Sequence, residues 1–263
     1  MPGSGQPGYG CGHEVLYRCN ECGHVFSANT TCMNRECPNC YEKWAFREGK
    51  IASWRVWTGS MQRCAEIEWN WQECRILHAV ISLPDRGTLL EENRSRARAI
   101  AKKHNLDGGL MVCHPFDQDG FVKFHIIALA HGDVLPGGTD GDVIFKVVRD
   151  AVHGDYRGFR DVASIKRAVQ YLLTHCGIYE GRHALTWWGS LSYNKMPIQK
   201  LKDNFLGWSE MIAFHRRCPK CRSLDVEFLE TPQDIGWRSV NPIRHSPFYG
   251  VPWAGVVNET RLV

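Results

Sequence analysis

The stretch GLMVCHPFDQDGFVKFHIIALAHG, residues 109–132, decides the fold because it reads as two apolar strands joined by a turn. Successive side chains of a strand point to opposite faces, so Lys123 and His125 share one face of the second strand. If the turn lies at residues 117–120, His114 on the first strand falls opposite Lys123. The hairpin therefore predicts that His114, Lys123 and His125 converge on one face of a sheet.

Helix and strand patterns alternate around this hairpin. The sequence predicts a strand at 75–84, a helix at 89–104, the hairpin, a short apolar run at 143–148, a helix at 160–177 and a strand at 183–195. Asp161 is the expected N-cap of the second helix, and Gly177 is its stop. The main order is that of a split βαβ, or ferredoxin-like, domain of the α+β class. Such a domain carries both helices on one face of an antiparallel sheet and leaves the other face for a site.

The composition is that of a folded globular protein, since 43% of the 263 residues are hydrophobic and 23% are charged. The net charge of +4 does not by itself indicate nucleic-acid binding, which must be inferred from where the cations lie. No apolar run is long enough to span a membrane, and residues 1–10 lack the charged and apolar parts of a signal peptide. We therefore expect a cytoplasmic protein with no membrane partner.

Four segments are expected along the chain. They are a flexible N-terminus at 1–10, a zinc-binding module with a linking helix at 11–60, the α+β domain at 75–200 and a C-terminal segment with a Cys-x2-Cys knuckle at 201–263.

The 12 cysteines indicate metal binding, because six of them lie within residues 11–40 and a reducing compartment disfavours disulfides. The knuckles Cys19-x2-Cys22 and Cys37-x2-Cys40 are separated by 14 residues, a pattern that offers four thiolates to one tetrahedral zinc ion. Which four side chains bind stays open, because other candidates lie nearby: Cys11, His13, His24 and Cys32, the last of which forms Cys32-x4-Cys37.

A further pair, Cys218-x2-Cys221, lies far along the chain and is preceded by His215. These residues supply three ligands. The fourth would come from the N-terminal module or from His245, so that a metal ion would clip the two ends of the chain together. We therefore expect one or two structural zinc ions.

Several further motifs occur in a characteristic order. They are the cysteine-rich segment at 17–45, VCHPF at 112–116, a strand with Phe124 and His125, VQYLLTHCGI at 169–178 and TWWGSLSYNK at 186–195. In this order they resemble the HUH nucleases, and most closely the rolling-circle replication initiators of archaeal plasmids and viruses. The resemblance covers about residues 11 to 221 and implies a DNA replication initiator that nicks and rejoins one strand.

In that family two histidines and a third polar side chain hold Mg²⁺ or Mn²⁺, and a tyrosine attacks the scissile phosphate to leave a 5′-phosphotyrosine. The resemblance implies that His125 is the second motif histidine, that His114 is a further ligand and that Tyr171 is the nucleophile. His175, one helical turn later, shares the face of Tyr171 and is expected to aid the metal or the proton transfer. An aromatic at position 171 also fits a core position of the helix.

Lys123 departs from the family pattern, because it stands where the first motif histidine is expected. A protonated ammonium group cannot ligate a cation and repels it. Three interpretations stay open: a site rebuilt around His114, His125 and a group such as His175, a direct contact of Lys123 with phosphate, or a domain that binds DNA without nicking it.

Basic and aromatic side chains predict contacts with single-stranded or hairpin origin DNA. Phosphate contacts are expected from Arg94, Arg96, Arg98, Lys102, Lys103, Arg157, Arg160, Lys166 and Arg167, and around the late cysteine pair from Arg216, Arg217, Lys220 and Arg222. Base stacking is expected from Trp187, Trp188 and Tyr193. A non-catalytic DNA-binding protein and an RNA-binding zinc-ribbon protein are the alternatives. The sequence has no Walker-type GxxxxGK[ST] motif, so a helicase would come from a partner.

Overall fold

The computed structural model describes residues 1–9, 11–66, 75–115, 120–149, 159, 161–197, 218–223, 225–229 and 256–257. The chain forms two compact units. The sheet unit comprises residues 1–2 and 45–206, and the cysteine unit comprises residues 3–44 and 207–263. The boundary falls inside helix α1 (Tyr41–Glu66), so most of the expected linking helix belongs to the sheet unit.

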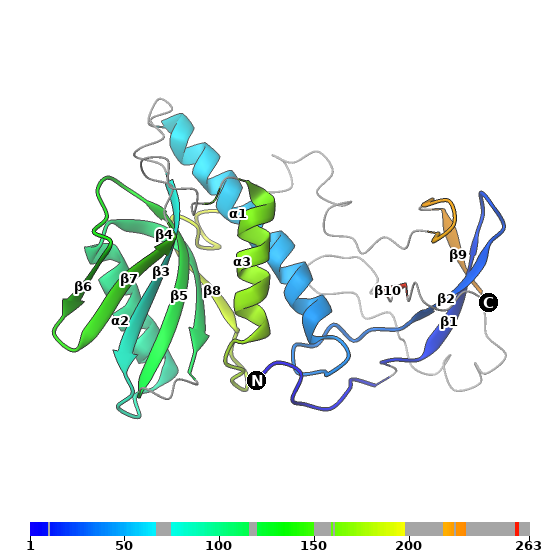
Figure 1. The fold of residues 1–263 in the computed structure, drawn as a ribbon, viewed down its shortest axis with the longest axis horizontal. Coiled ribbons are helices and arrows are strands. Elements are labelled where there is room, and N and C mark those ends of the chain that lie inside the picture. Colours follow the sequence, from blue (N-terminus) through cyan, green and yellow to red (C-terminus); the bar gives the residue numbers. More distant parts are fainter. Residues whose placement is uncertain are drawn as a thin grey trace. The chain divides into compact units, whose positions relative to one another are not determined.

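The sheet unit contains a six-stranded antiparallel sheet (Figure 1). Its order is β6 (Gly137–Asp140), β7 (Val143–Arg149), β3 (Arg75–Pro84), β5 (Phe121–Ala130), β4 (Leu106–His114) and β8 (Leu185–Gly189). Helix α2 (Leu90–Lys103) connects β3 to β4, and β5 lies between these two strands, which is the expected split βαβ unit. The last strand, β8, pairs with β4, whereas a four-stranded ferredoxin-like order would place it beside β3. The β6–β7 hairpin occupies that edge of β3 instead.

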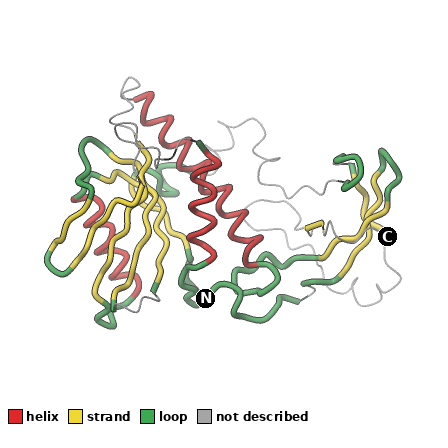
Figure 2. The backbone as a smooth tube through the Cα atoms, in the orientation of Figure 1, coloured by secondary structure: helices red, strands yellow, loops and turns green. Residues whose placement is uncertain are grey.

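Helices cover both faces of this sheet, as Figures 1 and 2 show. Ala97, Ile100 and Ala101 of α2 pack in one core cluster with residues such as Leu77 and Phe124 from one face. On the other face, His114 contacts a backbone carbonyl of helix α3 (Val162–Thr174). The expectation that both helices lie on one face is therefore wrong. The physical reason is that β4 and β5 are almost entirely buried, so both of their faces need cover.

The register of the opening hairpin is confirmed. His114 pairs with Lys123, and Val112 pairs with His125. The turn at 116–119 lies outside the described residues, and Gly120 closes it with a φ of 71°. The Asp161 cap of α3 is also confirmed, because its side chain accepts a hydrogen bond from the backbone N–H of Ser164.

The cysteine unit is built on a second antiparallel sheet of order β10 (Val256–Val257), β2 (Val25–Asn29), β1 (Glu14–Cys19) and β9 (Val226–Leu229). Strand β9 pairs with β1, so the two ends of the chain share one sheet. The N-terminal residues expected to be flexible are hydrogen-bonded. The backbone N–H groups of Gly3 and Gly5 donate to the carbonyl oxygens of Arg35 and Glu36 at 2.9 and 2.8 Å.

Candidate functional site

Three imidazoles meet on the α3 side of the sheet, and we call His78, His114 and His125 the histidine cluster. They come from three neighbouring strands, β3, β4 and β5. Nε2 of His78 lies 3.0 Å from Nδ1 of His125, and the rings of His114 and His125 are 4.3 Å apart between centroids. The sequence prediction missed His78, because a single histidine in the apolar strand RILHAVISLP gives no signal by itself.

The histidine cluster is held neutral. Burial, assisted by the charges of His114, His78 and Lys123, lowers the pKa of His125 to about 3. Burial and the charge of Arg149 lower the pKa of His78 to about 4. The pKa of His114 is also lowered by burial, although its hydrogen bond to Leu172 opposes the shift. Neutral imidazole is the form that binds a metal ion.

Two hydrogen bonds determine where the lone pairs of these rings point. Nε2–H of His114 donates to the carbonyl oxygen of Leu172 at 2.9 Å, which leaves its Nδ1 as the acceptor. Between His78 and His125 one nitrogen donates and the other accepts. If Nδ1–H of His125 is the donor, its Nε2 keeps a free lone pair for a ligand.

Tyr171 lies on α3, next to the residue that contacts His114. Its side chain is 65% exposed, which excludes the core position that its helical spacing also allowed. Its ring lies against His175 with 4.8 Å between centroids and a tilt of 45° between the ring planes. Nδ1–H of His175 donates to the Tyr171 carbonyl at 3.0 Å. His175 is close enough to His114 for its charge to lower the pKa of that ring. The helix therefore carries an exposed phenol and an exposed imidazole beside the histidine cluster.

The cysteines form two groups of four. The first group is Cys11, Cys32, Cys37 and Cys40, the second is Cys19, Cys22, Cys218 and Cys221, and within each group the sulfur atoms lie within 4.8 Å of one another. The two knuckles thus belong to different groups, and the assignment of both to one ion is wrong. The pair at 218–221 takes its partners from the N-terminal module, as expected for a clip between the chain ends.

Both cysteine groups fit a tetrahedral metal ion. Measured sulfur separations include 3.2 Å for Cys11–Cys40, 3.5 Å for Cys19–Cys221 and 3.6 Å for Cys22–Cys218. Disulfides need about 2.05 Å, whereas zinc with bonds of about 2.3 Å places its sulfurs about 3.8 Å apart. Although burial opposes it, hydrogen bonds from the backbone of Cys221 and Lys220 lower the pKa of Cys218 to about 7. Each group could therefore hold an ion such as zinc.

The remaining candidate ligands are not drawn together. In the described part of the chain, the two cysteine groups are the only sets of three or more side chains whose ligand atoms all lie within 4.8 Å. His13 and His24 belong to neither set, and His215 and His245 lie outside the described residues. The histidine cluster thus offers paired imidazoles rather than a closed three-nitrogen cage.

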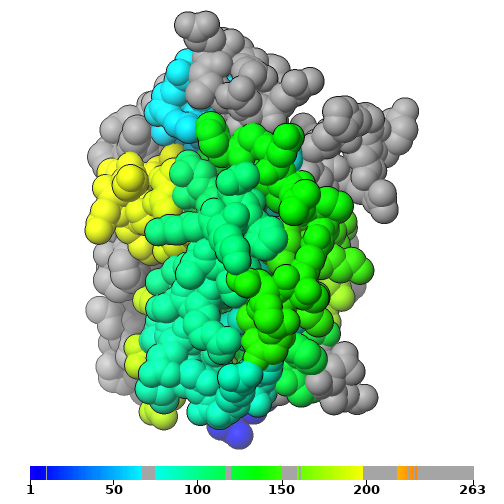
Figure 3. Space-filling view, turned by 90° about the vertical axis from the view of Figure 1, so that its left-hand side faces the viewer, coloured from blue at the N-terminus to red at the C-terminus, as the bar shows by residue number. Residues whose placement is uncertain are grey.

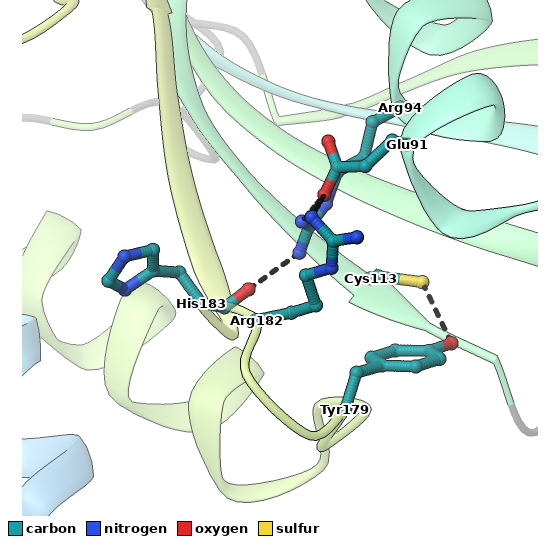
Figure 4. A network of polar contacts seen from close by, with 6 residues as sticks. All are labelled: Glu91, Arg94, Cys113, Tyr179, Arg182 and His183. Carbon is teal, nitrogen blue, oxygen red and sulfur yellow. Dashed lines mark hydrogen bonds and ion pairs between the residues drawn. The ribbon is translucent and has the colours of Figure 1, made fainter.

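Two of the residues expected to contact DNA are buried. The guanidinium of Arg94 is bound within the protein, because Nη1 donates to Glu91 at 2.7 Å and Nη2 donates to the carbonyl oxygen of His183 at 2.5 Å (Figure 4). Trp188 is 4% exposed and belongs to the core against α2, so it has no surface for base stacking. In the sequence Arg94 lies three and seven residues before Ala97 and Ala101, which is the spacing of one helix face, and this was the signal that Arg94 points inward.

Lys220 and Arg222 belong to the cysteine unit, whereas the other expected phosphate contacts of the sheet unit lie on two different sides of the sheet. Arg98 and Lys102 are on α2, which packs on the face opposite to the histidine cluster. Lys166 and Arg167 are on α3, where Nζ of Lys166 lies 4.6 Å from the centre of the Phe46 ring. Arg157, Arg160, Arg216 and Arg217 lie outside the described residues. Cations on α3, but not those on α2, are on the same side as the imidazoles.

Comparison with protein-family models, with curated proteins and with solved structures finds no match to this chain. None of the helices in the described ranges has the length and apolar character needed to cross a bilayer.

Proposed function

We propose that the sheet unit is a metal-dependent single-strand DNA endonuclease and strand transferase of the HUH type, serving as a replication initiator. The observation that carries this proposal is the exposed Tyr171 on a helix that touches a cluster of neutral imidazoles. This arrangement pairs a nucleophile with groups able to hold a divalent cation. Its substrate is single-stranded or hairpin origin DNA, and a helicase is supplied by a partner.

The chemistry is a transesterification at phosphorus. The phenolic oxygen of Tyr171 bonds to the scissile phosphorus and the bond to the 3′ oxygen breaks, so that this oxygen takes a proton from water and leaves as a free 3′-hydroxyl. Reversal by a 3′-hydroxyl rejoins the strand and releases Tyr171. His175 receives the phenolic proton at Nε2, because its Nδ1–H is held by the Tyr171 carbonyl.

The histidine cluster is the cation site of this proposal. His114 presents Nδ1 and His125 presents Nε2, and His78 accepts the Nδ1–H of His125 and so fixes the ring. A bound Mg²⁺ or Mn²⁺ supplies positive charge to the phosphate oxygens. Lys123, opposite His114 in the hairpin, adds a second positive charge for the same phosphate.

A non-catalytic DNA-binding protein is the second candidate, and the position of Lys123 favours it. This ammonium group is close enough to lower the pKa of His125, so it also repels a cation bound there. Both candidates share the cysteine groups, which as structural zinc sites contribute folding free energy to the cysteine unit.

The deciding experiment replaces Tyr171 with Phe, which removes only the nucleophilic oxygen. Wild type incubated with labelled single-stranded DNA and Mn²⁺ should form a covalent adduct that survives denaturing gel electrophoresis, and Tyr171→Phe should form none while binding DNA as before. Tyr193→Phe is the matched control, because Tyr193 is similarly exposed at 57%. An adduct in Tyr171→Phe would exclude Tyr171 as the nucleophile, and no adduct with wild type would favour the binding protein.

A further inference from the structure

The side of the sheet that carries the histidine cluster continues past α3 onto β3, β7 and β6. The pairing places His114, Lys123, Ser82 and Ile144 in one cross-strand row, and His125, Val80 and Lys146 in the next. Side chains in such rows share a face. The imidazoles and the outer residues of β7 are therefore parts of one continuous surface.

A β-bulge extends this surface. The register of β3 against β7 shifts between His78 and Ala79, so that Arg149 pairs with His78 while Val147 pairs with Ala79. The extra residue brings Arg149 to the face of the imidazoles. The pairing sets Arg149 directly opposite His78, and its charge adds to the effect of burial in lowering the pKa of that imidazole.

Strand β7 leaves this face open. Ile144 and Val148 are 42% and 41% exposed, and Lys146 and Arg149 are exposed as well. Exposed aliphatic side chains alternating with cations are unusual for the solvent face of an antiparallel strand, which is normally polar. The β6–β7 hairpin lies at the free edge of the sheet (Figures 1 and 3), so a long ligand can reach it from the side.

The charge on this face has one sign. Its strand positions carry Lys123, Lys146 and Arg149, and in the described strands β6, β7, β3 and β5 no Asp or Glu occupies a position on the same face. No carboxylate in the described ranges pairs with Lys146 or Arg149, although the Arg149 guanidinium lies 5.9 Å from the centre of the Phe159 ring. A surface of cations and apolar side chains suits a ligand with a phosphate backbone and unpaired bases.

We propose that the outer face of β7 binds single-stranded DNA, with Lys146 and Arg149 contacting phosphates and Ile144 and Val148 contacting bases. This inference rests on the proposed function for the identity of the ligand. Neighbouring strands lie about 4.8 Å apart, so Lys146, two strands from His125, contacts DNA about 10 Å from the scissile phosphate. The DNA path therefore runs across the sheet face and not along α2, whose cations lie behind the sheet.

The test measures DNA affinity without cleavage. Fluorescence anisotropy of a labelled single-stranded oligonucleotide is followed on the Tyr171→Phe background without added Mn²⁺ or Mg²⁺, at several salt concentrations, so that the zinc of the cysteine groups is retained. Lys146→Ala and Arg149→Ala should each weaken binding at least fivefold and reduce the slope of log affinity against log salt by about 0.7. Lys102→Ala is the matched control, since it removes an equally exposed cation from α2, and it should change neither quantity.

The outcomes separate this inference from the nuclease proposal. Adduct formation by wild type together with unchanged binding by Lys146→Ala and Arg149→Ala would refute the DNA path and leave the nuclease intact. Weakened binding by both variants with no wild-type adduct would support the path and refute the nuclease. Ile144→Asp tests whether this face is instead an interface between copies of the chain. If wild type self-associates on gel filtration and Ile144→Asp does not, while DNA binding is unchanged, the face is a protein interface and the inference fails.

Discussion

Replacement of Cys19 and Cys37 by Ser, singly and together, tests how the metal ligands are divided. The two residues belong to different cysteine groups, so each single variant should lose one zinc ion per chain and the double variant should lose both. If the two neighbouring knuckles shared an ion, the double variant would lose no more zinc than either single variant. Zinc content therefore distinguishes the two arrangements directly.

The two ions should also differ in how they depend on folding. In the first group Cys11 and Cys37 are 26 positions apart, and in the second group Cys22 and Cys218 are 196 apart. Closing the longer loop from an unfolded chain costs about 1.8 kcal/mol more, from 3/2 RT ln(196/26), which is roughly 20-fold in zinc affinity. In the folded protein the pairing of β1 with β9 already holds this loop closed. Zinc should therefore leave the second group first as guanidinium unfolds the chain.

Released zinc can be followed with a colorimetric chelator during the unfolding titration, and total zinc by atomic emission. Cys64→Ser is the matched control, because Cys64 is a buried thiol outside both groups, and it should keep both ions. A Cys19→Ser/Cys37→Ser protein that still holds one zinc ion per chain would refute the division of ligands. Simultaneous release of both ions from wild type would refute the loop argument.

Three further outcomes are expected in the sheet unit. Unfolded histidines titrate near pH 6.5, whereas folded His78 has a pKa of about 4. Lowering the pH from 6.5 to 4 should therefore reduce the free energy of unfolding by about 3 kcal/mol through this residue. Denaturation curves in which His78→Gln loses as much stability with falling pH as wild type would contradict this. Arg94→Met should lower the free energy of unfolding by about 1–3 kcal/mol because buried hydrogen bonds are lost, and an equal effect of the partly exposed Arg96→Met would refute the assignment. Lys123→His should tighten Mn²⁺ binding in calorimetry by replacing an ammonium with an imidazole beside His125; unchanged affinity would mean that the hairpin is not a metal site.

Local patterns predicted the parts of the fold that depend on neighbouring residues. The position of the turn placed His114 opposite Lys123, and the preference of an aspartate for helix starts placed the cap at Asp161. The α+β class and the split βαβ unit followed from the order of such elements. The position of β7 beside β3 did not, because this pairing depends on which edge of β3 is free in the assembled sheet.

The parts of the site that were not predicted depend on long-range contacts or on which face of a strand a side chain occupies. His78 joins the cluster only because β3 pairs with β5, about 50 residues away in the chain. Cys19 and Cys22 are ligand partners of cysteines near the other end, which no local spacing can show. Trp187 and Trp188 point to opposite faces, so the choice of a stacking residue depended on a register that the sequence leaves undefined.

The shared sheet of the two chain ends has a consequence for biosynthesis. The first cysteine group can fill as soon as residue 40 has left the ribosome, whereas the thiols of Cys19 and Cys22 must wait for Cys218. At about 5–20 residues per second, translation of the intervening 196 positions takes roughly 10–40 s. For that time the nascent chain displays two unsatisfied thiols, and any fragment that stops before residue 218 keeps them permanently. Only chains whose synthesis has passed residue 221 can therefore complete the second cysteine group.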